Sequence, residues 1–158
     1  MMARFFTIPF SIIVALVLQI VPLPALVDIY RPDWALIVLS YWAMALPHRL
    51  NVAGAFITGI GLDILLGTPL GIHSLVLSIC VFILVANYQR LRNYSVWQQS
   101  IVIALLSAFY HLLQFWLLHL LTDIYFRYDY LMPTITSMVF WPWAFWFLRR
   151  LRRQLKLK

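Results

Sequence analysis

Apolar stretches separated by short polar segments recur along nearly the whole chain. Stretches long enough to cross a hydrocarbon layer of about 30 Å predict membrane-spanning helices. The predicted spans are residues 5–26, 34–46, 52–66, 70–88, 96–122 and 131–148. The polar segments between them contain Pro, Gly, Asp and Arg, as is typical of loops. The pattern therefore predicts an all-α membrane protein with a single six-span bundle over residues 1–148, followed by a basic tail over 149–158.

The second and third stretches are short, and they allow an alternative in which both form one broken helix of a five-span protein. At about 1.5 Å per residue, stretches of 13 and 15 residues reach only about 20 to 22 Å. A merged helix would place Arg49 near the middle of the bilayer, at a cost of about 2.5 to 3.5 kcal/mol. It would also place Pro47 inside the helix, where proline removes a backbone hydrogen bond. A turn at residues 47–51 avoids both problems, so six crossings are expected.

In the six-span arrangement, most basic residues lie on one side of the membrane and most acidic residues lie on the other. Ten of the 12 Lys and Arg residues fall on one side, four of the five Asp residues fall on the other, and Asp63 alone is left within the membrane. Short loops rich in Lys and Arg stay cytoplasmic, so both chain ends are predicted to be cytoplasmic. The predicted cytoplasmic set is Arg4, Arg49, Arg90, Arg92, Arg149, Arg150, Arg152, Arg153, Lys156 and Lys158. The predicted outer set is Asp28, Arg31, Asp33, Asp123, Arg127 and Asp129.

Composition supports one compact membrane domain, since 64% of the 158 residues are hydrophobic. The net charge of +7 would suggest a nucleic-acid partner in a soluble protein. Here six basic residues occupy the last ten positions, so a membrane-side tail accounts for the charge and no nucleic acid is expected. The tail is predicted to lie on anionic lipid. It could also dock an acidic cytoplasmic partner, and a plain orientation anchor is the favoured interpretation. The single cysteine, Cys80, excludes an intrachain disulfide.

Asp63 is the leading candidate for a functional residue, because an ionisable group inside a span is costly and needs a partner within the bundle. Gly59 and Gly67 lie four residues on either side of it, so on a helix the three share one face. A neighbouring backbone could approach closely there. Two interpretations remain: a proton or substrate site, and a structural hydrogen bond that locks helix packing. The second is favoured because no other carboxylate is expected nearby.

The histidines and the missing motifs argue against catalysis. His119 and Asp123 are four residues apart, and a local hydrogen bond between them is predicted rather than a metal site. The sequence contains no Glu, no Ser-x-x-Lys, no His-Glu-x-x-His and no glycine-rich phosphate loop. We therefore expect no enzyme activity, no metal and no cofactor.

The last predicted span is rich in aromatic residues around Trp141, Pro142 and Trp143. Tryptophan usually marks the membrane interface, but several of these residues lie deeper. This face is a candidate surface for a partner helix, and lipid-facing aromatics are equally compatible. Close association of helices is further expected at Gly54, Gly59 and Gly61. A homodimer across the short spans is also compatible, although no residue pattern demands one.

Several short motifs, in order and at matching spacing, resemble a known family. They are Arg31-Pro32-Asp33-Trp34, Tyr41-Trp42, Ala45-Leu46-Pro47-His48-Arg49, Gly59 with Asp63 and Gly67, Trp97-Gln98-Gln99, and Trp141-Pro142-Trp143. Together they are similar to the rod shape-determining protein MreD of Gram-negative bacteria. The resemblance covers nearly the whole chain and is weakest in the first helix and over residues 123–130.

The resemblance implies a non-catalytic scaffold of the bacterial cell inner membrane that supports cell shape and peptidoglycan synthesis in the elongation complex. It implies direct binding to MreC within the membrane. It also implies a shared assembly with MreB filaments, the glycosyltransferase RodA and the elongation transpeptidase. Finally, it implies a fold related to the substrate-binding membrane subunits of energy-coupling-factor vitamin transporters.

A transporter subunit that binds a small molecule beside Asp63 is the rival interpretation. A vitamin-sized ligand needs several convergent polar groups, and the predicted spans contain few. For the scaffold, we expect Asp63 and Arg49 to anchor the geometry of the second and third spans.

Overall fold

The computed structural model describes the backbone of residues 2–154 and the side chains of residues 6–154. Within these residues the chain is helical and contains no strand. The six longer helices are α1 (Met2–Ile20), α3 (Trp34–Ala45), α4 (Val52–Leu66), α5 (Ile72–Ala86), α7 (Val96–Leu121) and α8 (Met132–Gln154). The short elements are α2 (Ala25–Asp28), α6 (Tyr88–Asn93) and the 3-10 helix η1 (Tyr128–Leu131). Lys156, Lys158 and the side chain of Arg4 lie outside the described residues.

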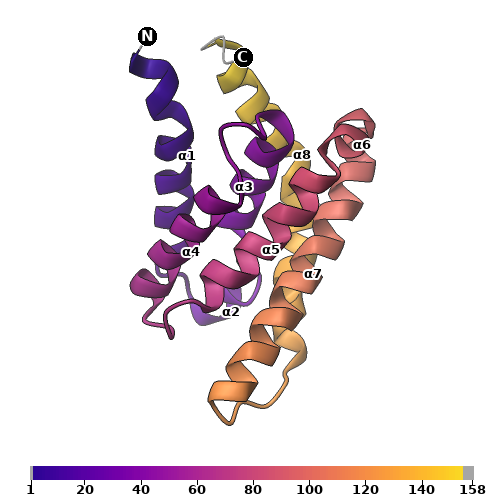
Figure 1. Ribbon diagram of the computed structural model, residues 1–158. Coiled ribbons are helices and arrows are strands. Elements are labelled where there is room, and N and C mark those ends of the chain that lie inside the picture. The colour runs from indigo at the N-terminus through magenta and orange to yellow at the C-terminus, as the bar shows by residue number, and fades with distance from the viewer. Residues whose placement is uncertain (1, 155–158) are drawn as a thin grey trace.

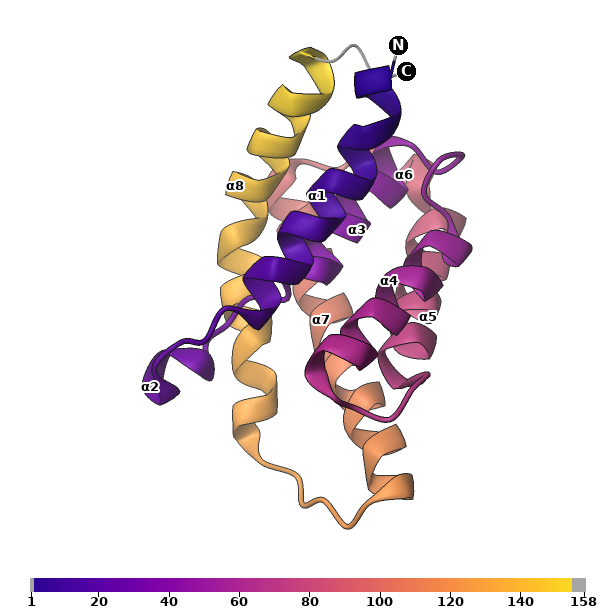
Figure 2. The ribbon, with the colours of Figure 1, turned by 90° about the vertical axis from the view of Figure 1, so that its left-hand side faces the viewer.

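The six longer helices alternate in direction through the bundle, and the first turn of α1 lies at the same end as the last turn of α8 (Figures 1 and 2). The residues from Pro47 to Leu50 form a turn and a bend between α3 and α4. The alternative of one merged helix over residues 34–66 is therefore wrong. The turn leaves Arg49 exposed to the surroundings of the bundle rather than buried in its middle.

Helix α3 forms the centre of the bundle. It packs against α1, α5, α7 and α8, and nine of its 12 residues are buried. A helix that is apolar on all sides is expected to be enclosed by protein. At about 1.5 Å per residue α3 is only about 18 Å long, but its ends are covered by neighbouring elements. Protein therefore surrounds most of this short helix.

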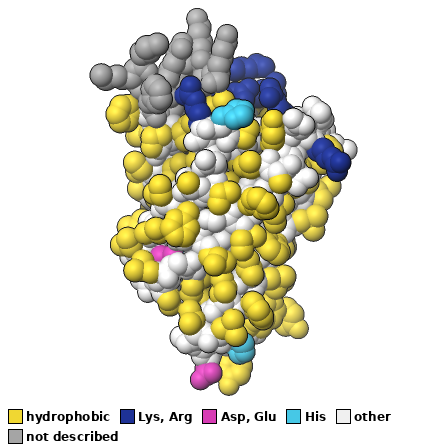
Figure 3. All heavy atoms as spheres, viewed as in Figure 1, with side chains coloured by type: hydrophobic (Ala, Val, Ile, Leu, Met, Phe, Trp, Pro, Cys, Tyr) yellow, Lys and Arg dark blue, Asp and Glu magenta, His cyan; other side chains and the backbone are white. Residues whose placement is uncertain are grey.

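Two helices of the described chain, Val96–Leu121 and the segment Tyr128–Gln154, are long and apolar enough to cross a membrane by length and composition. Four shorter apolar helices accompany them: Phe6–Ile20, Trp34–Ala45, Val52–Leu66 and Ile72–Ala86. The outer surface of the bundle is rich in large apolar side chains. Figure 3 shows them over most of the visible face, whereas Lys and Arg gather toward the end that holds the last turn of α8.

The first span ends earlier than predicted. Helix α1 stops at Ile20 rather than continuing to residue 26, because Pro22 and Pro24 cannot donate backbone hydrogen bonds and restrict the residues before them. Arg31 covers the open end of α1 by donating to the carbonyl oxygens of Gln19 and Val21, the latter at 2.6 Å. A cation at a helix C-terminus is favourable because it faces unpaired carbonyls.

The later boundaries also shift. Helix α5 ends at Ala86, and the predicted polar connection after residue 88 forms the short helix α6 instead. Helix α8 continues past residue 148 to Gln154 and passes through Pro142 without interruption. Arg149, Arg150, Arg152 and Arg153 therefore belong to the last turns of α8 rather than to a separate tail.

Helices α4 and α5 form a closely packed hairpin. A Cβ atom placed on Gly59 would lie 2.8 Å from the carbonyl carbon of His73 and closer still to the Cα of Ser74. Only a glycine leaves room for the α5 backbone here. Gly67 does not contribute to this contact: it ends α4 in the left-handed conformation with φ 66°, and nothing would lie within 4 Å of its Cβ. The close packing expected at Gly54 and Gly61 is likewise not a contact with a neighbouring backbone, since their nearest atoms belong to leucine side chains.

Substituting Gly59 by alanine is expected to destabilise the hairpin by roughly 1 to 3 kcal/mol, because the added methyl group meets rigid backbone. Thermal unfolding of the purified chain in detergent would measure the loss. Gly61→Ala is the matched control, since its Cβ would lie 3.7 Å from a flexible Leu16 side chain. Equal melting temperatures for the two variants would contradict this packing.

Candidate functional site

Asp63 lies near the end of α4 and is fully enclosed between α4 and α5, with 1% of its surface exposed. Its carboxylate accepts hydrogen bonds from the backbone N–H groups of Gly71 at 2.9 Å and His73 at 3.1 Å. Gly71 has no side chain with which to cap α5. Asp63 therefore supplies, from the preceding helix, the negative group that a helix N-terminus favours.

Side chains complete the shell around Asp63. Thr68 Oγ1 donates to Asp63 at 2.9 Å, Ser74 Oγ donates at 3.2 Å, and His73 Nδ1 donates at 2.8 Å. The amide nitrogen of Gln114 on α7 lies 3.0 Å from His73 Nε2, so it donates to the ring when the imidazole proton is on Nδ1. The Asp63 cluster thus joins α4, α5 and α7 and leaves neither carboxylate oxygen facing a cavity.

Asp33, predicted in the polar turn on the outer side, ends that turn as the residue before α3 and forms a second buried cluster there. The residue is 4% exposed at the start of α3. His111 Nε2 donates to its two carboxylate oxygens at 2.9 and 3.0 Å, and Ser107 Oγ also donates to it. The Asp33 N–H donates to Ser137 Oγ at 3.0 Å. The Asp33 cluster therefore ties the start of α3 to α7 and α8, and Asp63 is not the only buried carboxylate.

The geometry of the Asp33 cluster does not match a catalytic triad. In a triad the histidine lies between serine and aspartate and takes the serine proton. Here Asp33 lies between Ser107 and His111, so the imidazole is not positioned on the hydroxyl. The arrangement fastens helices together and does not activate a nucleophile. Within residues 6–154, no three His, Cys, Asp or Glu side chains gather in a way that could hold a metal ion.

The predicted hydrogen bond between His119 and Asp123 is also wrong. His119 Nδ1 donates to the carbonyl oxygen of Ile124 at 2.8 Å, because the helix ends at Leu121 and the chain turns back over the ring. His73 and His111, the partners of the buried carboxylates, were not predicted from the sequence. In the first case a signal existed, since His73 follows Asp63 across a short Gly-Thr-Pro turn.

Two cavities open at opposite ends of the bundle. One of about 200 Å³ is lined by residues of α3, α6, α7 and α8 near the last turns of α8. The other, of about 480 Å³, is lined by Asp28, Ile29, His111, Arg127, Asp129, Tyr130 and Pro133. His111 of the Asp33 cluster borders the second cavity, whereas Asp63 borders neither.

Comparison with known proteins identifies the family. The family model described as rod shape-determining protein MreD matches residues 1–151. The chain is 35% identical over 154 residues to the rod shape-determining protein MreD of Haemophilus influenzae, covering 98% of this chain and 95% of that protein.

The chain belongs to the MreD family. Its role is therefore in determining cell shape, and its apolar helices agree with association with a membrane. No solved structure matches the chain, so the relation to transporter subunits stays a prediction. In this MreD-family fold, the buried carboxylates of Asp33 and Asp63 hold neighbouring helices together through hydrogen bonds.

The aromatic candidates on α8 divide between the core and the surface. Trp141 is completely buried, Pro142 is half-buried, and Trp143 is 75% exposed. Arg49 and Pro47 lie in the turn before α4, whereas Asp63 lies near the other end of that helix. Arg49 and Asp63, which were predicted to anchor these helices, therefore lie at opposite ends of α4.

Asp63→Asn is expected to lower the free energy of unfolding by roughly 1 to 3 kcal/mol, because an amide replaces one accepting oxygen and leaves buried donors unpaired. Hydrogen–deuterium exchange should rise over residues 68–74, where these donors lie. Asp123→Asn, at an exposed position, makes the same chemical change and should leave exchange unaltered. Unchanged exchange in both variants would show that Asp63 does not hold the start of α5.

Proposed function

We propose that this protein is a non-catalytic scaffold of the bacterial inner membrane that binds MreC within the membrane. MreB, RodA and the elongation transpeptidase would belong to the same assembly, which supports peptidoglycan synthesis. The observation that carries the proposal is the match to the MreD family over residues 1–151. The enclosed polar clusters agree with a scaffold, since their hydrogen-bonding groups are used to join helices.

The six longer helices are proposed to cross the membrane with both chain ends in the cytoplasm. Arg90, Arg92 and the arginines of α8 belong to elements at the end of the bundle where α8 finishes (Figure 1). Asp28 and Asp129 lie on α2 and η1 at the opposite end. Basic loops are retained in the cytoplasm during insertion, so this separation favours the proposed orientation.

Reporter fusions test the orientation. A fluorescent protein fused before Met1 or after Lys158 should fluoresce, because both ends are expected in the cytoplasm. Alkaline phosphatase inserted between α7 and η1 should be active, because that loop is expected in the periplasm. A reporter at Met1 that functions only in the periplasm would overturn the six-span arrangement.

The exposed aromatic face of α8 is proposed as the surface for MreC. Val139, Trp143 and Phe147 follow one another at helical spacing and are 61%, 75% and 63% exposed. Trp143 lies six residues, or about 9 Å along the helix, before the first arginine of the basic end. Large rigid aromatic side chains are typical of the residues that dominate binding energy at interfaces. Gly59 is not available to a partner because α5 already occupies its surface.

Trp143→Ala is expected to reduce co-purification of MreC by at least about tenfold, as loss of a central aromatic contact costs roughly 2 kcal/mol or more. Trp97→Ala on α7 is the matched control, because Trp97 is equally exposed at 75%. Co-purification is measured from membranes in mild detergent, together with cell shape. Equal retention of MreC by both variants would exclude this face of α8.

The rival interpretation, a small-molecule-binding transporter subunit, required a cavity beside Asp63. Asp63 is instead enclosed by protein donors and borders neither cavity. The scaffold is therefore the function that we propose.

A further inference from the structure

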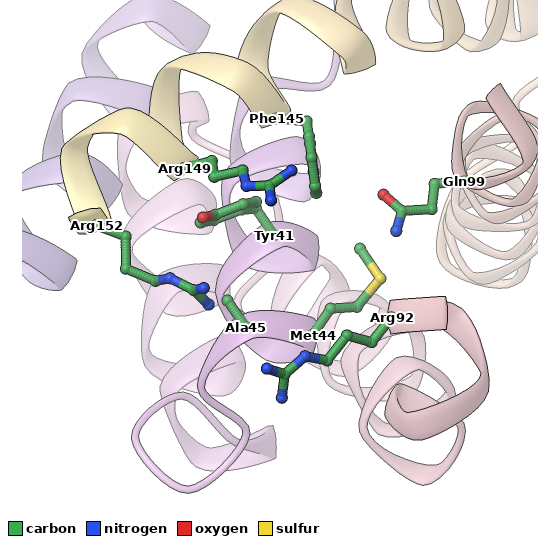
Figure 4. A pocket seen from close by; sticks show the side chains of 8 residues that line it. All are labelled: Tyr41, Met44, Ala45, Arg92, Gln99, Phe145, Arg149 and Arg152. Carbon is green, nitrogen blue, oxygen red and sulfur yellow. The ribbon is translucent and has the colours of Figure 1, made fainter. Parts of the chain in front are cut away.

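The smaller cavity carries an unusual concentration of positive charge. It has a volume of about 200 Å³ and is lined by Tyr41, Met44, Ala45, Arg92, Gln99, Phe145, Arg149 and Arg152. Figure 4 shows Arg149 extending from α8 alongside Tyr41 and Arg152 extending from α8 toward Ala45, while Arg92 extends from α6 on the facing side. These eight residues are called the arginine cavity below.

No side chain of the arginine cavity is acidic. Asp28 and Asp129 pair with Arg31 and Arg127 at the other end of the bundle, and Asp33 and Asp63 belong to their own clusters. Three guanidinium groups held around one small cavity repel one another unless an anion lies between them. Arginine is also the side chain best suited to bind a phosphate group, because one guanidinium can donate hydrogen bonds to two phosphate oxygens.

The arrangement of Arg149 supports a built site. Its guanidinium carbon lies 5.8 Å from the centre of the Phe145 ring, a distance at which cation and ring attract each other. Phe145 in turn packs against Tyr41, with ring centres 5.6 Å apart. The arginine therefore rests on an ordered aromatic surface at the wall of the cavity instead of extending freely from α8.

Gln99 gives independent evidence that a ligand binds in the arginine cavity. It is 4% exposed, and its amide nitrogen donates to the carbonyl oxygens of Leu91 at 3.0 Å and Tyr94 at 3.4 Å. These two bonds fix the amide, and its oxygen then has no partner among the described residues. A buried acceptor without a donor calls for a ligand or water. Figure 4 shows this oxygen directed toward the side of the cavity that carries Arg149.

We propose that the arginine cavity binds the phosphate group of an anionic phospholipid. Arg92, Arg149 and Arg152 bind the phosphate oxygens, and the Gln99 oxygen accepts a hydrogen bond from a hydroxyl of the headgroup. The volume is below the roughly 300 to 1,000 Å³ typical of pockets for drug-sized ligands, but it suits a headgroup whose acyl chains stay outside.

The membrane orientation makes lipid the expected source of the phosphate. In the proposed topology the arginine cavity lies at the cytoplasmic end of the bundle, level with the headgroups of the anionic leaflet. Free inorganic phosphate carries the same oxygens and a donor hydroxyl, so the two sources have to be separated by experiment. The site goes beyond the scaffold function and does not depend on the presence of MreC.

Native mass spectrometry of the full chain in detergent tests the site, with phosphatidylglycerol as the probe. Arg92→Gln and Arg149→Gln should each weaken retention of one phosphatidylglycerol by about tenfold, as expected for loss of a charge-assisted hydrogen bond. Arg90→Gln on α6 and Arg150→Gln on α8 are matched controls, because they remove the same charge from the same helices outside the cavity. Both controls should retain the lipid.

Two comparisons distinguish the sources. Phosphatidylcholine has a phosphate but neither net negative charge nor a headgroup donor, so it should bind more weakly than phosphatidylglycerol. If inorganic phosphate raises the melting temperature while phosphatidylglycerol does not, the lipid assignment is overturned. If all four arginine variants lose the lipid equally, general attraction by the basic end of the bundle explains the binding. That result would also overturn the proposed site.

Arg152→Gln keeps the test decisive if the Arg92 or Arg149 variant does not fold. Arg152 lines the cavity from the last turns of α8, whereas its neighbour Arg153 is not among the lining residues, so Arg153→Gln is the matched control. Arg152→Gln should weaken retention of phosphatidylglycerol by about tenfold, and Arg153→Gln should leave it unchanged. An Arg152→Gln protein that folds and binds phosphatidylglycerol as tightly as the unaltered chain would refute the proposal.

Discussion

A carboxylate enclosed by apolar helices needs donors from the chain itself, and two such carboxylates organise this bundle. Asp63 receives two backbone and three side-chain hydrogen bonds across the α4–α5 hairpin. Asp33 receives donors from α7 and α8 at the start of α3. Unsatisfied polar groups are expensive in a medium that cannot hydrogen-bond to them. Each cluster therefore fixes the position of its helices relative to one another. Apolar packing between smooth helix surfaces fixes that position less strongly.

These clusters agree with the shape-determining role of the MreD family, because the scaffold that we propose has to present partners with a fixed surface. The core of the bundle is occupied by α3 and by the clusters that border it. Its outer faces remain apolar and rich in aromatic side chains. Its basic end combines the last turns of α8 with α6 around the arginine cavity. The surface proposed for a partner helix and the site proposed for a lipid headgroup rest on this apolar flank and this charged end.

Much of the architecture was predictable because it depends on local patterns. The turn at Pro47 and the end of α4 at Gly67 follow from proline and glycine, and the enclosure of Asp63 follows from a lone acidic residue in an apolar run. The end of α1 was misjudged because apolar residues continue through Pro22 and Pro24, and hydrophobicity alone does not reveal that the backbone has left the helix. The extension of α8 was missed because the arginines were interpreted as the limit of the span, although arginine is a good helix former.

The order of charges and apolar runs along the chain determined its class, its helices and the separation of its basic and acidic residues. Only the tertiary structure decided which polar groups meet. Asp33 and His111 are 78 positions apart, and Asp33 and Ser137 are 104 apart, so no periodicity links them. The same holds for the arginine cavity, whose members come from four helices. Hydrophobic periodicity reports which residues avoid water, but the pairing of buried donors and acceptors depends on how whole helices cross.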